Sequence, residues 1–212
     1  NREEDSLRWA AEIASRFPDD RWQEFILAAV NNRVTRFIRE GKTNEARNFL
    51  EIYKTNILYA NYSQLDSIIT DAELLRSANQ ILAAADGDAV VNAIVNARSS
   101  GKITERRAAE LITFAVQKSA AILCAAPARD WRAAIRYIEN ALSRFGANRE
   151  LEQALRTYRN NLAVEYHNRF AAEWNNRNYE AAERILNEGL AEFPADRQLL
   201  ANRDIVIRHN SR

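Results

Sequence analysis

Apolar residues recur along this chain at the spacing of one face of an α-helix. Between residues 129 and 145, Trp131, Ala134, Ile138 and Phe145 follow an i, i+3, i+7, i+14 pattern, which places them on one side of a helix. No alternating apolar and polar run lies between hairpin turns, so the pattern predicts an all-α protein. We expect about ten helices, over the segments 3–17, 20–40, 43–60, 62–85, 88–99, 104–126, 129–145, 148–176, 178–193 and 196–209.

Glycine and proline mark most of the breaks between these segments, because both residues interrupt helices. The chain has five Gly and three Pro. All of them fall between segments, Gly87 and Pro18 included, except Gly189. The connections are short, so consecutive helices are expected to pack as antiparallel hairpins. Side chains that cap helix N-termini stand at several predicted starts, namely Asp19, Asp20, Thr43, Asp88, Thr104 and Asp196.

A short pattern recurs at the ends of three segments. It reads Phe17-Pro18, Phe145-Gly146 and Phe193-Pro194, and in each case an Asp or Asn and then an Arg follow. Self-similarity of this kind is typical of proteins built from helical repeats.

Residues 163–194 resemble a tetratricopeptide (TPR) repeat. The residues that match its pattern of large, small and aromatic positions are Phe170, Ala171, Trp174, Tyr179, Ala182, Leu186, Gly189 and Pro194. The match implies that Gly189 lies where neighbouring helices approach closely. Residues 20–55 and 129–146 match less completely, and residues 62–100 match weakly. The resemblance implies a right-handed α-solenoid of antiparallel helix hairpins, extending as a single domain over residues 1–212.

The repeat spacing departs from that family. The small residue of the second helix recurs at Ala46, Ala93, Ala134 and Ala182, at intervals of 41 to 48 residues. The TPR period is shorter, at about 34 residues. We therefore expect TPR-like pairs with elongated first helices, and an α-solenoid of the HEAT or armadillo type is the structural alternative.

The first and the last predicted helix have no second helix with which to form a hairpin. The chain starts at Asn1 rather than at Met, and segment 3–17 resembles a second helix without its first. We therefore expect a fragment, or the mature part, of a longer chain. The apolar residues expected to be half covered at the start are Leu7, Ala10, Ala14 and Phe17, and those expected to cap the last pair are Leu199, Leu200, Ile205 and Ile207.

Charge and composition exclude several classes of protein. Thirty basic and 29 acidic residues give a net charge of +1, and the two signs are interspersed without a basic run, so we expect no nucleic-acid partner. One Cys excludes a disulfide framework. The longest uncharged apolar stretch, 119–128, is far shorter than the ~20 residues of a membrane span. A bacterial cytoplasm or periplasm fits this composition, and the oligomeric state is left open.

Sequence motifs for catalysis are missing. No metalloprotease, nucleophile-elbow or phosphate-loop motif occurs, so we expect no enzyme, no cofactor and no metal site. His167 is expected to face solvent or a partner. Cys124 lies in the apolar stretch 120–126, which favours packing over nucleophilic reactivity. Asp86 and Asp88 lack the further ligands of a calcium loop, and we expect a helix connection there, with Asp88 as the N-cap.

The expected function follows from the family resemblance. In TPR proteins the first helices line a concave groove that holds a partner segment, and asparagine amides can bond to its backbone. We therefore expect a non-enzymatic scaffold that binds a partner peptide or domain in that groove. A helical small-molecule or lipid-binding protein, with a cavity between the long helices, is the alternative, and the asparagines can equally belong to helix ends or solvated faces. The predicted groove residues are Asn31, Thr35, Arg39, Glu165, Asn168, Asn175 and Asn176.

Overall fold

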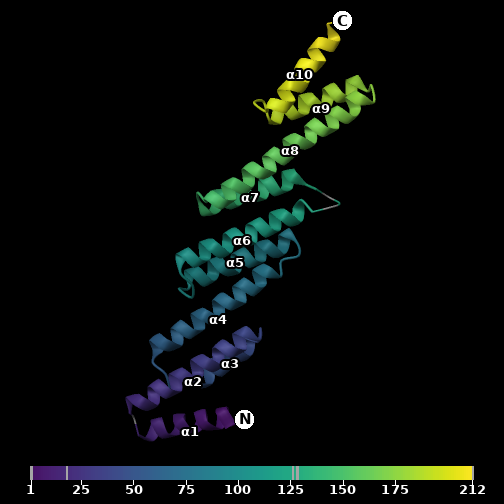
Figure 1. Ribbon diagram of the computed structural model, residues 1–212. Coiled ribbons are helices and arrows are strands. Elements are labelled where there is room, and N and C mark those ends of the chain that lie inside the picture. The colour runs from purple at the N-terminus through teal and green to yellow at the C-terminus, as the bar shows by residue number, and fades with distance from the viewer. Residues whose placement is uncertain (1, 18, 126, 128, 212) are drawn as a thin grey trace. The chain divides into compact units, whose positions relative to one another are not determined.

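The computed structural model describes residues 2–17, 19–125, 127 and 129–211. Within these residues the protein consists of ten α-helices and no strand (Figure 1), which confirms the all-α prediction. The helices are α1 (Arg2–Arg16), α2 (Asp20–Arg39), α3 (Thr43–Ile52), α4 (Tyr59–Asn79), α5 (Ala84–Ser99), α6 (Glu105–Leu123), α7 (Trp131–Phe145), α8 (Arg149–Asn175), α9 (Tyr179–Glu192) and α10 (Arg197–Asn210).

The chain forms two compact units, Asn1–Ala115 and Val116–Arg212, and the division falls within α6. We call them the N-terminal and the C-terminal unit and describe each by itself. A single solenoid over residues 1–212 stays a prediction.

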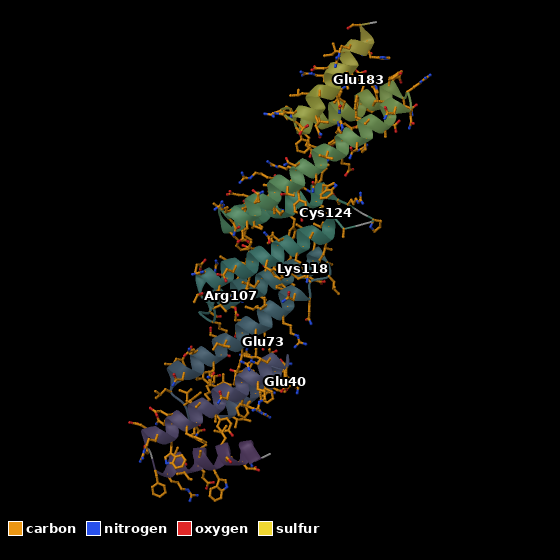
Figure 2. The ribbon with its side chains drawn as sticks, in the orientation of Figure 1. Glu40, Glu73, Arg107, Lys118, Cys124 and Glu183 are labelled. Atoms are coloured by element: carbon orange, nitrogen blue, oxygen red, sulfur yellow. The ribbon has the colours of Figure 1, made fainter. Side chains whose placement is uncertain are left out.

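In the N-terminal unit, α2 packs against α1, α3 and α4. Its buried face is the stripe Ile26, Val30 and Val34, which recurs every fourth residue and faces Leu50 of α3 and Ile69 of α4 in one apolar cluster. A stripe with this period must be buried on other helices, since one helix cannot cover its own apolar face. In the same unit Arg107 of α6 (Figure 2) donates to Asp71 of α4, with Nε 2.5 Å from Oδ1.

In the C-terminal unit, the long helix α8 packs against α7, α9 and α10. Tyr166 and Phe170 of α8, Ala182 and Leu186 of α9 and Leu199 of α10 are buried together. Three of the eight positions on which the TPR resemblance rests, Phe170, Ala182 and Leu186, are buried in this cluster, and Trp174 packs against it.

Three of the predicted N-cap residues, Asp19, Thr104 and Asp196, do cap their helices. The carboxylate of Asp19 accepts the N–H of Arg21 at 2.9 Å, and that of Asp196 accepts the N–H groups of Gln198 and Leu199 at 3.0 Å. The hydroxyl of Thr104 accepts the N–H of Arg107 at 3.2 Å. Thr43 is not a cap: it is the first residue of α3 and its side chain is buried. Pro18 lies outside the described residues.

The helix boundaries between residues 52 and 88 differ from those predicted. Helix α3 ends at Ile52 rather than residue 60, and α4 begins at Tyr59, so the polar stretch 60–63 is helical. Helix α5 begins at Ala84 because the Asp86 carboxylate accepts the N–H groups of Ala83 and Leu82, at 3.1 and 3.4 Å. Asp88 is therefore not the N-cap, and Gly87 lies buried inside α5 instead of breaking the chain.

The end helices are covered differently from the prediction. Leu7 and Ala10 are buried rather than half covered, Ala14 is half-buried as predicted, and Phe17 is 68% exposed. The buried face of α10 consists of Leu199, Asn202 and Val206. Ile205 and Ile207 are exposed, because they lie outside the i, i+3, i+7 face that Leu199, Asn202 and Val206 form on this helix.

Candidate functional site

The predicted groove residues are divided between the two units. Asn31, Thr35 and Arg39 lie on α2, and the others lie on or just after α8. Each unit therefore carries part of the predicted set.

A groove of about 330 Å³ lies between α2 and α4 in the N-terminal unit. Of the predicted residues only Asn31 lines it; Thr35, on the next turn of α2, does not, nor does Arg39. Each helix contributes one face, with the spacing i, i+3, i+4, i+7. The lining residues are Glu24, Leu27, Ala28 and Asn31 from α2 and Asn61, Gln64, Leu65 and Ile68 from α4. We call this the α2–α4 groove.

The α2–α4 groove combines an apolar floor with amide side chains. Leu65 is buried and Leu27 half-buried, while Ile68 is exposed. Asn31 and Gln64 are exposed, so their amides are open to solvent on opposite helices. Glu24 is the one charged residue among those that line it.

Sequence reasoning missed the contribution of α4 to this groove. The family resemblance is weak over this part of the chain, and no residue of α4 was predicted to bind a partner. A signal was nevertheless present: Asn61, Gln64, Leu65 and Ile68 repeat the spacing of Glu24, Leu27, Ala28 and Asn31.

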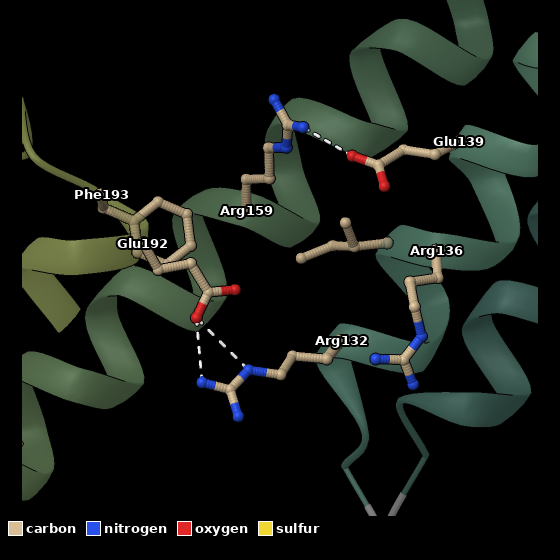
Figure 3. A pocket seen from close by; sticks show the side chains of 7 residues that line it. Arg132, Arg136, Glu139, Arg159, Glu192 and Phe193 are labelled. Carbon is tan, nitrogen blue, oxygen red and sulfur yellow. Dashed lines mark hydrogen bonds and ion pairs between the residues drawn. The ribbon is translucent and has the colours of Figure 1, made fainter. Parts of the chain in front are cut away.

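A second pocket, of about 340 Å³, lies in the C-terminal unit (Figure 3). One face of α7 provides most of its wall. The lining residues are Arg132, Ile135, Arg136 and Glu139 from α7, Arg159 from α8, and Glu192 and Phe193 at the end of α9. We call it the arginine pocket.

Two ion pairs cross the arginine pocket. Arg132 Nη2 lies 2.9 Å from Glu192 Oε2, and Arg159 Nη2 lies 2.6 Å from Glu139 Oε1. Figure 3 shows both pairs, and Arg136 beside them without one. Among the described residues no carboxylate or other partner bonds to the Arg136 guanidinium, which is exposed.

Tyr166 holds two lining residues of this pocket, Arg132 and Glu192, in place. Its hydroxyl donates to Glu192 Oε2 at 3.1 Å and accepts a hydrogen bond from Arg132. Burial raises the pKa of the Tyr166 hydroxyl, and the hydrogen bond to the Glu192 carboxylate raises it further. The hydroxyl therefore stays protonated at neutral pH and remains a donor to Glu192.

An adjoining pocket of about 300 Å³ shares Arg132 with the arginine pocket and is also lined by Tyr166. Glu165, one of the predicted groove residues, lines it together with Arg129 and Arg169. The Arg132 and Arg169 guanidinium carbons lie 5.7 and 5.9 Å from the centre of the Tyr166 ring, within cation–π range.

The remaining predicted residues line none of these three pockets. Asn168 is exposed on α8, Asn175 is the last residue of that helix and Asn176 is its C-cap. The positions of Asn175 and Asn176 fit the alternative interpretation, in which asparagines belong to helix ends. Asn is favoured there because its side chain bonds to nearby backbone groups that a helix end leaves free.

The two candidate reactive side chains are held in packing contacts. His167, predicted to face solvent or a partner, is half-buried, and its Nδ1 lies 3.0 Å from Nδ2 of the buried Asn202. An amide NH₂ can only donate, so Nδ1 is the acceptor in this contact and the ring is held against α10.

Cys124 follows the end of α6 (Figure 2) and is half-buried. Burial raises the pKa of its thiol to about 11, and the negative charge of Asp130 adds to the shift. The side chain is therefore a thiol, not a nucleophilic thiolate, at neutral pH.

Among the described residues no group of three or more His, Cys, Asp or Glu side chains is placed to hold a metal ion. No helix within the described ranges combines the length and the apolar character that crossing a bilayer requires. Known proteins add no identification, since no family model, curated protein or solved structure matches this chain.

Proposed function

We propose that the protein is a non-enzymatic interaction scaffold that binds a peptide segment of a partner protein in the α2–α4 groove. The observation that carries this proposal is the position of Asn31, a predicted groove residue, opposite Gln64 above an apolar floor. Amides donate and accept hydrogen bonds at once, as a peptide backbone requires. An apolar floor accepts the side chains that decide sequence preference.

The chemistry of the groove suggests the kind of segment it takes. Leu65 and Ile68 offer apolar contact for one or two large side chains. The carboxylate of Glu24 favours a basic residue next to them, because opposite charges at an interface select the partner and its orientation. We therefore propose a segment in which an apolar residue is followed or preceded by Lys or Arg.

A TPR-like α-solenoid is the architecture we propose for this scaffold. In each unit one long helix contacts the helix two places further on: α2 contacts α4, and α8 contacts α10. Contacts between alternate helices accompany the stacking of successive hairpins. The close approach at Gly189, which the family resemblance implies, supports the same register.

The walls of all three pockets also favour a peptide over a lipid or other apolar small molecule. Charged or amide side chains line each of them. Sites for apolar ligands are mostly lined by apolar and aromatic groups, with few polar ones.

A random peptide library displayed on phage tests the proposal. Selection on the purified protein is expected to enrich sequences with an apolar residue next to a basic one. The double variant Asn31→Ala, Gln64→Ala should bind the enriched peptides more weakly, since each lost hydrogen bond contributes about 0.5–1.5 kcal/mol. The matched control is Asn44→Ala with Asn48→Ala, which removes two exposed amides from α3. Equal binding by the groove variant and the unchanged protein, or no enrichment, would contradict the proposal.

A further inference from the structure

We propose that the arginine pocket of the C-terminal unit is a separate binding site, specific for the carboxylate side chain of an acidic peptide. Arg136 holds the carboxylate, and Ile135 and Phe193 contact an apolar side chain next to it. The proposal does not depend on the α2–α4 groove, which belongs to the other unit.

The face of α7 in the pocket has an uncompensated positive charge. Arg132 and Arg136 are four residues apart, so their side chains are neighbours on the helix surface. Like charges at this spacing destabilise a helix. Glu192 neutralises Arg132, whereas Arg136 has no carboxylate partner among the described residues. An anion that binds Arg136 removes the repulsion and supplies the missing charge.

The charge balance of the pocket fits a ligand group with a single negative charge. Three arginines and two glutamates line it, so their formal charges sum to +1. Both glutamates already take part in ion pairs, as Figure 3 shows. A carboxylate matches this surplus. A phosphate dianion would bring an extra negative charge close to Glu139 and Glu192, which would repel it.

The arginine side chain suits a carboxylate geometrically. The guanidinium is planar and presents parallel N–H groups that bind the two oxygens of a carboxylate together. The exposed position of Arg136 leaves these N–H groups open to solvent. The ligand therefore gains two charge-assisted hydrogen bonds without breaking an internal ion pair.

The rest of the pocket is held in place before a ligand arrives. Arg132 is bonded to both Glu192 and Tyr166, and the Tyr166 side chain is buried in the core of the unit. Phe193 packs edge-on against the Tyr166 ring, with ring centres 6.3 Å apart. Such preorganisation lowers the entropic cost of binding. Phe193 is half-buried and so keeps apolar surface that a ligand side chain can cover.

Three capped synthetic peptides that differ at one position test the assignment. The parent has the sequence Ser-Leu-Glu-Leu-Ser, and Gln or phosphoserine replaces its Glu in the other two. With arginine Nε labelled by ¹⁵N, titration of the Glu peptide to millimolar concentration is expected to shift the Arg136 resonance. The Gln peptide should bind about tenfold or more weakly, because hydrogen bonds to charged groups are the strong ones. The phosphoserine peptide should bind no tighter than the Glu peptide.

Two variants locate the site. Arg136→Gln should lose about tenfold or more of the affinity for the Glu peptide. Arg184→Gln, which removes an exposed arginine from α9 outside the pocket, should leave that affinity unchanged. Circular dichroism melts should show both variants folded and no less stable than the unchanged protein, because neither residue is buried and Arg136→Gln also removes the repulsion with Arg132. The α2–α4 groove double variant should bind the Glu peptide normally, which separates the two proposals.

Several results would overturn the assignment. One is no shift of the Arg136 resonance, and another is equal binding of the Glu and Gln peptides. Tenfold tighter binding of the phosphoserine peptide would assign the pocket to phosphate instead. Binding of a single-stranded oligonucleotide that Arg136→Gln abolishes, with no binding of the Glu peptide, would assign it to nucleic acid.

Discussion

Tyr166 of α8 packs so closely on Gly189 of α9 that a Cβ atom on residue 189 would lie 3.1 Å from both Cβ and Cγ of the tyrosine. A third atom, Cδ1 of Leu199, would be at the same distance. Tyr166 is almost fully buried, and its hydroxyl is bonded to Glu192 and Arg132. The contact therefore joins three helices at a point where one of them has no side chain.

Replacing Gly189 by alanine should destabilise the C-terminal unit. Alanine is the better helix former by about 1 kcal/mol. The Tyr166 side chain, however, is held by α8 at its Cβ and by Glu192 and Arg132 at its hydroxyl, so it cannot move away easily. Overpacking typically costs about 1–3 kcal/mol, so we expect a net loss and a lower urea midpoint. The control is Asn187→Ala on the exposed face of α9, where the gain in helix propensity is unopposed. A Gly189→Ala protein more stable than the original would show that the helices separate readily.

Ala182→Leu should also destabilise the unit. Ala182 is completely buried between α8 and α10 residues, and the added carbons of leucine have no free space. We expect a loss of about 1–3 kcal/mol in the free energy of unfolding, measured in urea. Ala191→Leu, an exposed position on the same helix, is the control and should change little. An unchanged midpoint for Ala182→Leu would mean that the contact between these helices is loose.

Arg47→Leu should destabilise the N-terminal unit through its ion-pair network. Arg47 of α3 donates to Asp66, Glu73 and Thr70 of α4, and the Asp66 side chain is only 17% exposed. Removing the guanidinium leaves two carboxylates with fewer donors, which costs about 1–3 kcal/mol. Thermal and urea unfolding measure the loss.

A matched surface pair provides the comparison for Arg47. Arg16 and Glu12 form an ion pair of 2.7 Å in which both side chains are more than half exposed. Arg16→Leu should therefore change the stability by less than about 1 kcal/mol. Equal effects of the two substitutions would mean that the Arg47 network contributes no more than a surface pair.

Cys124 should react slowly with alkylating reagents in the folded protein. Its pKa is raised to about 11 by burial and, secondarily, by Asp130, so at pH 8 the thiolate fraction is roughly a hundredfold lower than for an unperturbed thiol. The Cys124 thiol ionises at a lower pH in the unfolded chain than in the folded protein, so the free energy of unfolding decreases as the pH rises from about 9 to about 11. Iodoacetamide labelling followed by mass spectrometry measures the rate. Urea-unfolded protein is the control, and equal rates in the two states would contradict the shift.

The local pattern of the sequence determined most helices of this protein. The stripe that begins at Trp131 specifies α7, and its predicted end at residue 145 agrees with the structure. Ala182 and Gly189 were recognisable as positions of close approach through the resemblance of residues 163–194 to a TPR repeat. Such features depend on residues within a few turns of each other, and these are neighbours in sequence.

The start of α5 shows where the local pattern was insufficient. Gly87 and Asp88 read as a break and a cap, but the Asp86 carboxylate caps the helix from inside its first turn. Both arrangements satisfy the free N–H groups of a helix start. Which of the two arrangements is more stable depends on which residues the helix buries. In this protein Gly87 is buried within α5, which the arrangement with Asp86 permits.

The α2–α4 groove and the arginine pocket were decided by the tertiary structure alone. Arg132 and Glu192 are 60 residues apart in the chain, and Asn31 and Gln64 line the same groove only because α2 and α4 pack directly on each other. The sequence by itself determined which residues lie on one face of each helix. It did not determine which two faces meet, because that depends on the rotation and crossing of packed helices, and these are set by contacts between side chains far apart in sequence.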